Sequence, residues 1–231
     1  MLEFQRTYIK MRNFKNLRKC KYFKDLEDQD LLAFMRCVNV QIKDFYKDET
    51  IVSDGDSTEF IYIIFSGKAR SYTLDINGNR YINSDFGKDS IFGIDYQMAR
   101  GRVYHEYLKA LEDTTIIICN AFRFLNPCQN RCKRHIDSLR CTIEELGREI
   151  IDSKKRMNYM CKNKTRDKVM SYLSTIKAQT KKEYFAIPHN RQELADYLGL
   201  ERTALSAELS KMKKEGLIDF DKNYFKILKK N

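Results

Sequence analysis

The sequence predicts an α+β protein with a β-rich N-terminal domain, a long helix, and a helical C-terminal domain that ends in a β-hairpin. Short runs of β-branched and aromatic residues, separated by glycine and aspartate turns, fill residues 39–120. After residue 127 the apolar residues recur at spacings of three and four, which is typical of a helix. The expected parts are therefore 1–126, 127–163 and 164–231.

The N-terminal domain is expected to be a β-sandwich, jelly roll or barrel preceded by helices. Turn sequences such as Asp54-Gly55-Asp56 and Ser66-Gly67-Lys68 separate its apolar runs. Many short strands at close spacing indicate one of these β-architectures. The expected strands are residues 40–45, 60–65, 69–74, 80–86 and 114–119.

A heptad seam marks the long helix. Its apolar residues alternate at spacings of three and four, with Ser153 as the single polar interruption, and its other faces are charged. A helix of this length has too little apolar surface for a buried core element, so the seam favours a parallel homodimer. The alternative is a helix packed only on its own β-domain. The expected dimer-interface residues are Ile136, Leu139, Ile143, Leu146, Ile150, Met157 and Met160.

The C-terminal domain has the order of a winged helix-turn-helix. A helix from about 165 and a short strand at 185–188 precede two closely spaced helices, and a hairpin follows at 217–228. Asn190 and Glu193 have the spacing of a capping box, which predicts the start of the first of these two helices. Gly199 lies at the turn between them, where the chain favours a residue that tolerates positive φ.

The second of these helices is expected to enter the major groove of DNA. Its leucines are spaced for burial, which leaves Arg202, Thr203, Ser206 and Ala207 on the outer face. Arg202 can bind guanine through two hydrogen bonds, and Thr203 and Ser206 can contact bases or phosphate. The alternative for Arg202 is an ion pair with Glu201 or Glu208. The expected phosphate contacts are Arg191, Gln192, Lys211, Lys213, Lys214, Lys222 and Lys226.

The positive charge supports this placement. The formal net charge is +11, and basic residues exceed acidic ones by 2 within residues 1–150 and by 9 within 151–231. Such a concentrated field suits nucleic acid or an anionic membrane surface. The small side chains beside Arg202 favour a DNA groove, because membrane-surface helices place bulky apolar residues opposite their charges. We find no apolar run suited to a signal peptide or a membrane span, so we expect a cytoplasmic protein without a membrane partner.

Several motifs in a fixed order support a family assignment: KDETI at 47–51, Gly55-Asp56, IYIIFSG at 61–67, IFG at 91–93, the helix-turn-helix, and KEGLI at 214–218. Over residues 20–231 the chain resembles the Crp/Fnr family of bacterial transcription regulators. The resemblance implies a double-stranded β-helix of the cyclic-nucleotide-binding type, and a homodimer on a roughly palindromic operator with half-sites about 34 Å apart. It also implies RNA polymerase as a partner. Thr203 and Ala207 depart from the best-known family pattern, which has glutamate and a second arginine there.

The resemblance predicts an effector site in the β-domain but does not identify the effector. The cyclic-nucleotide members carry a Gly-Glu pair and an arginine followed by a hydroxyl residue, whereas here Gly93 precedes Ile94 and no such arginine stands in 103–109. A buried cyclic phosphate would lack its counter-charge, so cAMP and cGMP are not expected. We expect no resident cofactor. The candidate effector-pocket residues are Phe92, Gly93, Ile94, Arg100, Arg102 and Tyr104.

Two alternatives remain open. The chain has seven cysteines, and Cys128, Cys132 and Cys141 could serve a redox- or metal-responsive sensor of the same family, although the same residues are common in cores. A cupin-like enzyme or an interaction protein that binds no DNA is the other alternative. Catalysis is not expected, because the histidines are scattered over three segments and no nucleophile motif is present.

Overall fold

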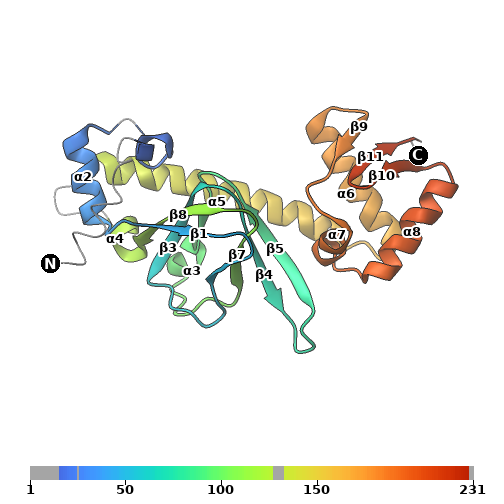
Figure 1. The fold of residues 1–231 in the computed structure, drawn as a ribbon, viewed down its shortest axis with the longest axis horizontal. Coiled ribbons are helices and arrows are strands. Elements are labelled where there is room, and N and C mark those ends of the chain that lie inside the picture. Colours follow the sequence, from blue (N-terminus) through green and yellow to red (C-terminus); the bar gives the residue numbers. More distant parts are fainter. Residues whose placement is uncertain (1–15, 25, 127–132, 229–231) are drawn as a thin grey trace. The chain divides into compact units, whose positions relative to one another are not determined.

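The structure is a computed structural model that describes residues 16–24, 26–126 and 133–228. The chain divides into two compact units (Figure 1). The first contains the described residues up to Leu74 together with 83–148, and the second contains 75–82 with the described residues from 149 onward.

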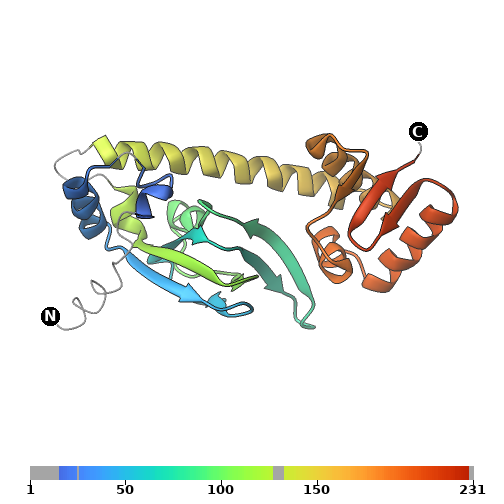
Figure 2. The ribbon, with the colours of Figure 1, turned by 45° about the horizontal axis from the view of Figure 1, so that its top comes forward.

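The β-strands of the N-terminal half form two four-stranded sheets, which can be followed in Figure 2. The first sheet has the order β1 (Gln41–Phe45), β8 (Thr114–Asn120), β3 (Phe60–Ser66) and β6 (Ile91–Phe92). The second has the order β2 (Thr50–Val52), β7 (Tyr107–Ala110), β4 (Ala69–Leu74) and β5 (Arg80–Phe86). Strand β8 pairs with β1 and β3, and β7 pairs with β2 and β4, all in antiparallel orientation, and the predicted β-domain of the jelly-roll type is confirmed.

The central strands β3 and β8 are buried on both faces. Ile64 and Ile116 belong to the core shared with the second sheet. Ile63 and Ile117 belong to the core formed with the helices α2 (Asp28–Cys37) and α4 (Ala121–Leu125). A strand covered on both sides has no polar face, which explains the continuous apolar runs in the sequence.

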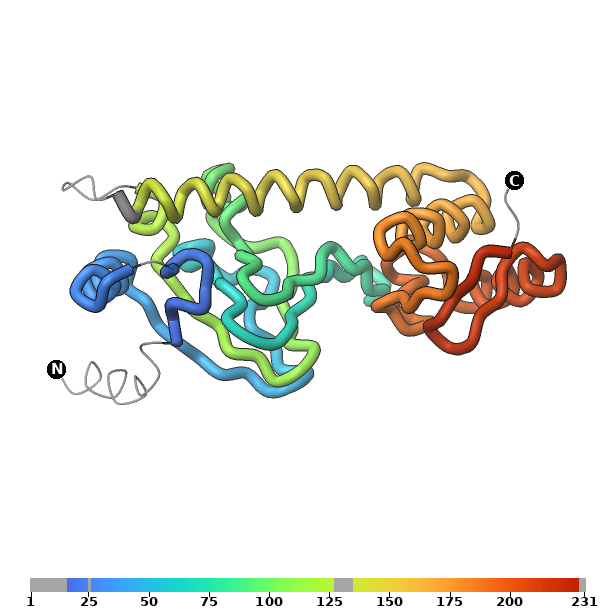
Figure 3. The backbone as a smooth tube through the Cα atoms, turned by 90° about the horizontal axis from the view of Figure 1, so that it is seen from above, coloured from blue at the N-terminus to red at the C-terminus, as the bar shows by residue number. Residues whose placement is uncertain are grey.

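The predicted long helix is α5 (Lys133–Met160), which Figure 3 shows as one unbroken helix. Polar side chains on one face are buried against the first unit: Ser138 Oγ donates to Tyr22 O at 3.3 Å, and Lys21 Nζ lies 2.7 Å from Glu145 Oε2. Several apolar residues of the predicted seam are exposed instead. The exposed seam residues are Ile136, Ile143, Ile150, Met157 and Met160, at 51%, 66%, 55%, 57% and 37% of their full exposure.

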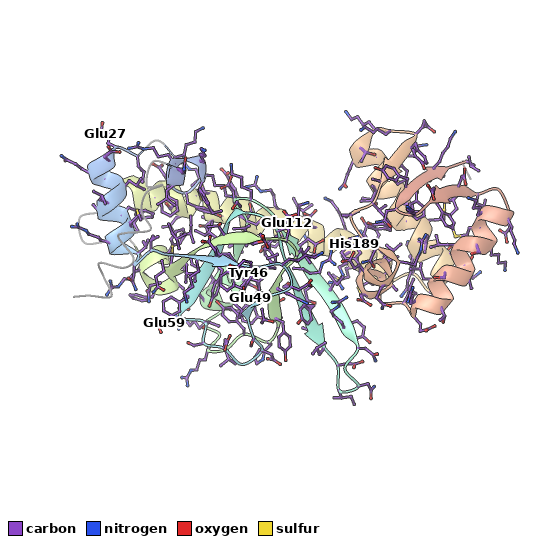
Figure 4. All side chains as sticks on the ribbon, viewed as in Figure 1. Glu27, Tyr46, Glu49, Glu59, Glu112 and His189 are labelled. Carbon is purple, nitrogen blue, oxygen red and sulfur yellow. The ribbon has the colours of Figure 1, made fainter. Side chains whose placement is uncertain are left out.

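The C-terminal domain has the predicted winged helix-turn-helix order. Its elements are α6 (Thr165–Thr180), β9 (Tyr184–Ala186), α7 (Arg191–Leu198), α8 (Arg202–Lys214), β10 (Ile218–Asp221) and β11 (Tyr224–Ile227). Phe185 and Phe225 pair across β9 and β11 and are buried in one core with Leu194 and Leu209. His189, labelled in Figure 4, is buried in this unit. Its ring stacks on that of Tyr197, with the two ring centroids 4.6 Å apart.

Candidate nucleic-acid interface

The turn between α7 and α8 has the geometry that its sequence predicts. The side-chain oxygen of Asn190 accepts a hydrogen bond from Glu193 N at 3.0 Å, and the Glu193 carboxylate accepts one from Asn190 N at 2.7 Å. This reciprocal cap satisfies two backbone amides at the start of α7. Gly199 ends α7 at a φ of 61°, where a side chain would be strained. Leu200 N donates back to Ala195 O at 2.9 Å and closes the turn.

The residues predicted to face DNA lie together on α8. Arg202, Thr203 and Ala207 are exposed, and Ser206 is partly exposed one turn further along the helix. The buried face of the same helix contributes Leu205, Leu209 and Met212 to the core. The first turn of α8 therefore presents one guanidinium among small side chains.

The guanidinium of Arg202 has no hydrogen-bond or ion-pair partner within the described parts of the chain. Both carboxylates considered as its partners are used elsewhere. Glu208 pairs with Arg166 at 2.7 Å. Glu201 accepts hydrogen bonds from Ala204 N at 3.3 Å and from the Thr203 hydroxyl. Arg202 is thus available to an external acceptor.

Arg166 of α6 holds the C-terminal part of α8. Its Nε donates to Glu208 at 2.7 Å, while Nη1 and Nη2 donate to Glu215 at 2.7 and 3.0 Å. Hydrogen bonds to these carboxylates raise the pKa of Arg166, and the arginine lowers the pKa of Glu215. The sequence did not point to this contact, because it joins residues 42 and 49 positions apart that only the fold brings together.

The predicted phosphate-binding residues fall into two groups. Lys211, Lys214, Lys222 and Lys226 are exposed, with Lys222 in the turn between β10 and β11. The other three, Arg191, Gln192 and Lys213, contact other groups of the C-terminal domain.

Lys213 Nζ lies 2.7 Å from Asp219 and donates to Phe220 O at 2.9 Å. Arg191 places its guanidinium 4.9 Å from the Phe220 ring centroid, and burial lowers the pKa of Arg191. Gln192 donates to Asp196 at 2.8 Å. These three residues have structural partners, and their contact with phosphate stays a prediction.

In the β-domain, four of the six candidate effector-pocket residues lie together. Phe92, Gly93 and Ile94 are buried where β6 passes into α3 (Ile94–Met98), and the Phe92 and Tyr104 ring centroids are 5.2 Å apart. A Cβ on Gly93 would lie 2.3 Å from the Tyr104 hydroxyl oxygen. The Tyr104 hydroxyl donates to Phe60 O. Tyr104 is therefore packed tightly in the interior.

Arg100 and Arg102 do not belong to this buried group. Both are exposed in the segment after α3, and Arg100 has a φ of 57°. The structure thus brings no arginine of the candidate pocket into contact with its buried part, among the residues it describes.

The sequence missed a polar cluster close to Tyr104. Asn83 donates to the Glu106 carboxylate at 2.9 Å, and the hydroxyls of Ser71 and Tyr96 also donate to it. Burial raises the pKa of Glu106, and burial followed by the charge of Glu106 raises the pKa of Tyr96 to about 12. A negative ligand placed here would meet a carboxylate. No sequence motif marked the cluster, because its members come from four separate segments.

The cysteine prediction is only partly within the described structure. Cys128 and Cys132 lie outside the described residues, and Cys141 packs against the N-terminal core. Burial raises the pKa of Cys20 and of Cys119, which keeps both thiols protonated. Among the described residues, no group of three or more histidine, cysteine or acidic side chains is placed to hold a metal ion. None of the helices found there combines the length and apolarity needed to cross a membrane.

Two family models match the chain. The model described as a cyclic nucleotide-binding domain matches residues 42–131, and the model described as a Crp-like helix-turn-helix domain matches 167–231. The first covers the two sheets, and the second covers most of the C-terminal domain.

Curated relatives align with most of the chain. Electron transport regulator A of Shewanella oneidensis is 25% identical over 194 residues, covering 80% of this chain and 74% of the relative. The transcriptional activator protein FnrA of Stutzerimonas stutzeri is 22% identical over 195 residues, covering 79% of this chain and 74% of the relative.

Solved structures share the fold. The global regulator CLP of Xanthomonas campestris superposes with a TM-score of 0.71 at 13% identity, over 88% of this chain and all of the other. FixK2 of Bradyrhizobium japonicum gives a TM-score of 0.61 at 20% identity, over 82% of this chain and 93% of the other. At these identities the likeness concerns the fold alone.

Proposed function

The chain belongs to the Crp/Fnr family of transcription regulators, and from this premise we propose that it binds a roughly palindromic DNA operator as a homodimer. In this proposal α8 lies in the major groove, and Arg202 recognises guanine through two hydrogen bonds. Thr203 and Ser206 add contacts to bases.

The main observation behind the proposal is that the Arg202 guanidinium has no partner among the described residues. It is exposed at the start of α8, and the neighbouring carboxylates are engaged by Arg166 and by the helix cap. An arginine already paired with a carboxylate would have to break that pair before it could bind a base. Arg202 needs no such exchange, which supports direct base recognition.

The distribution of side chains on α5 supports the dimer, because the helix buries a polar face and exposes apolar residues. Its buried face carries Ser138, Thr142 and Glu145, while Ile143 and Ile150 are exposed on another face. An exposed apolar stripe with heptad spacing is stabilised when a second copy covers it. We propose that the seam forms a parallel two-helix interface, which places the two recognition helices on adjacent half-sites.

An effector other than a cyclic nucleotide is proposed to act on the β-domain. The partly buried polar cluster near Tyr104 presents the Glu106 carboxyl group and neutral donors, an unfavourable environment for a phosphate. We further propose that the protein acts by binding rather than by catalysis, in the cytoplasm and together with RNA polymerase. The similarity to proteins named as regulators supports this role.

Selection from random duplexes tests the proposal. Purified protein is mixed with random duplex fragments near physiological salt, and the bound fragments are sequenced. We expect a palindrome to be enriched with the native chain and with Arg123→Ala, which removes an exposed arginine of the β-domain. We expect Arg202→Ala to lose the enrichment. A native protein that enriches no sequence, or an Arg202→Ala variant that keeps the same palindrome, contradicts the proposal.

A further inference from the structure

The turn between β10 and β11 places a lysine in an unfavourable backbone conformation. Lys222 has a φ of 51°, in the left-handed region where glycine is the residue without strain. Its side chain is exposed and forms no hydrogen bond or ion pair within the part of the chain that the structure describes. A strained residue with its ammonium group in solvent indicates that the charge serves a contact outside the chain.

Both carbonyl groups of this two-residue turn are held from outside the hairpin. Arg191 Nη2, in the first turn of α7, donates to Lys222 O at 3.2 Å. Ile187 N, in the segment that leads into α7, donates to Asn223 O at 2.9 Å. The turn carbonyls have no partner in the ladder between β10 and β11, so these two hydrogen bonds tie the turn to the start of α7.

Two aromatic rings fix the Arg191 guanidinium. Its central carbon lies 4.9 Å from the Phe220 ring centroid and 5.5 Å from that of Phe225. Phe220 and Phe225 pair across the hairpin, one from β10 and one from β11. Burial lowers the pKa of Arg191, and the two rings compensate part of the cost of removing a cation from water. One guanidinium therefore contacts both strands of the hairpin as well as its turn.

On the basis of the proposed function, we propose that Arg191 is a positioning residue for DNA binding, and that it fixes the hairpin turn so that Lys222 binds a backbone phosphate. This role replaces the direct phosphate contact that the sequence predicts for Arg191. Its guanidinium is directed at the hairpin, whereas the Lys222 ammonium group is exposed at the turn. A turn already held in place loses less conformational freedom when its lysine meets the phosphate.

The test titrates the enriched operator with the native protein, Arg191→Met, Lys222→Ala and the double variant at several salt concentrations. Each lost phosphate contact reduces the slope of log affinity against log salt by about 1. We expect the two single variants to give equal reductions and the double variant to give no further reduction, because both changes remove the same contact. Methionine keeps an apolar side chain on the two rings, and the melting temperature of each variant shows whether the domain is folded.

Lys211→Ala is the matched control, because Lys211 is exposed on α8, apart from the hairpin turn. Combined with Arg191→Met, it should reduce the slope by the sum of the two single reductions. Two results overturn the inference: a slope unchanged in Arg191→Met, or reductions that add in the double variant of Arg191 and Lys222, which would mean that Arg191 binds a phosphate of its own. A native protein that enriches no palindrome overturns the proposed function and this inference with it, whereas additive slopes on an enriched palindrome overturn this inference alone.

Discussion

Arg166 and Glu215 form a two-point ion pair, with both terminal nitrogens of the arginine on the two oxygens of the carboxylate at 2.7 and 3.0 Å. Arg166 lies in the first turn of α6, and Glu215 is the C-cap of α8. Its Nε holds Glu208 in the middle of α8. One side chain therefore fixes two points of the proposed recognition helix.

We expect Arg166→Met to lower the melting temperature and to weaken operator binding, because two carboxylates lose their partner. Lys162→Met, at an exposed lysine nearby, is the control and should change little. The effect should shrink in 1 M salt, which screens exposed ion pairs. A melting temperature that stays the same at low salt would show that the pair contributes nothing to stability.

The pair also sets a pH dependence. Because Arg166 lowers the pKa of Glu215 in the folded state, the ion pair stabilises the folded protein above the ordinary glutamate pKa. This stabilisation is lost as the pH falls through the lowered pKa of the folded state. The difference in melting temperature between the native protein and Arg166→Met should therefore be largest near neutral pH and vanish in acid. Thermal unfolding followed by circular dichroism measures this difference.

DNA binding by variants of Lys211 and Lys213 in α8 should respond differently to salt. Lys211→Ala is expected to weaken binding to all duplexes and to reduce the slope of log affinity against log salt by about 1, as for one lost phosphate contact. Lys213→Ala should change the slope less, because Lys213 is already paired with Asp219. Equal slopes for the two variants would contradict this assignment of phosphate contacts.

The dimer prediction rests on Ile143, which is 66% exposed in the single chain. Ile143→Glu should weaken self-association by roughly tenfold or more, because a carboxylate buried in an apolar seam is strongly unfavourable. Glu144→Lys changes a neighbouring exposed residue outside the seam and should leave association intact. Sedimentation equilibrium measures both. Native-like association of Ile143→Glu would favour the alternative of a helix that serves only its own chain.

Glu106 should make the β-domain less stable as pH rises. Burial raises the pKa of its carboxyl in the folded state, so the folded protein binds the proton more tightly than the unfolded chain. The stabilisation from the protonated Glu106 carboxyl is complete below the pKa that this group has in the unfolded chain. It is lost as the pH rises through the higher pKa that the group has in the folded protein. Glu106→Gln should remove this slope, which urea unfolding from pH 4 to 8 can measure. Parallel pH profiles for the two proteins would contradict the prediction.

Local signals in the sequence were sufficient for the helix-turn-helix and for most long strands. The capping box at Asn190 and Glu193 and the positive φ of Gly199 follow from short-range chemistry, and both are observed. The predicted strand 80–86 matches β5 residue by residue. Strands β2, β6 and β7 were not predicted, because they have only three, two and four residues and carry little periodicity.

Long-range pairing could not be predicted in the same way. The clamp of Arg166 on α8 and the donors around Glu106 join segments that are distant in sequence and carry no shared pattern. The polar buried face of α5 was equally hidden, since Ser138 and Thr142 read as solvent-exposed positions until their burial is known. The exposed Arg202 was predicted from its position in the motif, but the engagement of Glu201 and Glu208 with other partners follows only from the three-dimensional fold.

The helix α5 also bears on how the protein unfolds. Ser138 and Glu145 tie its first half to Tyr22 and Lys21 of the first unit, while Tyr159 at its other end is 4% exposed within the core of the second. A C-terminal fragment that began at residue 164 would lack Tyr159 and its edge contact with Tyr172 at 5.8 Å. Fraying of the last turns of this helix would therefore remove a buried aromatic side chain from the core of the C-terminal unit.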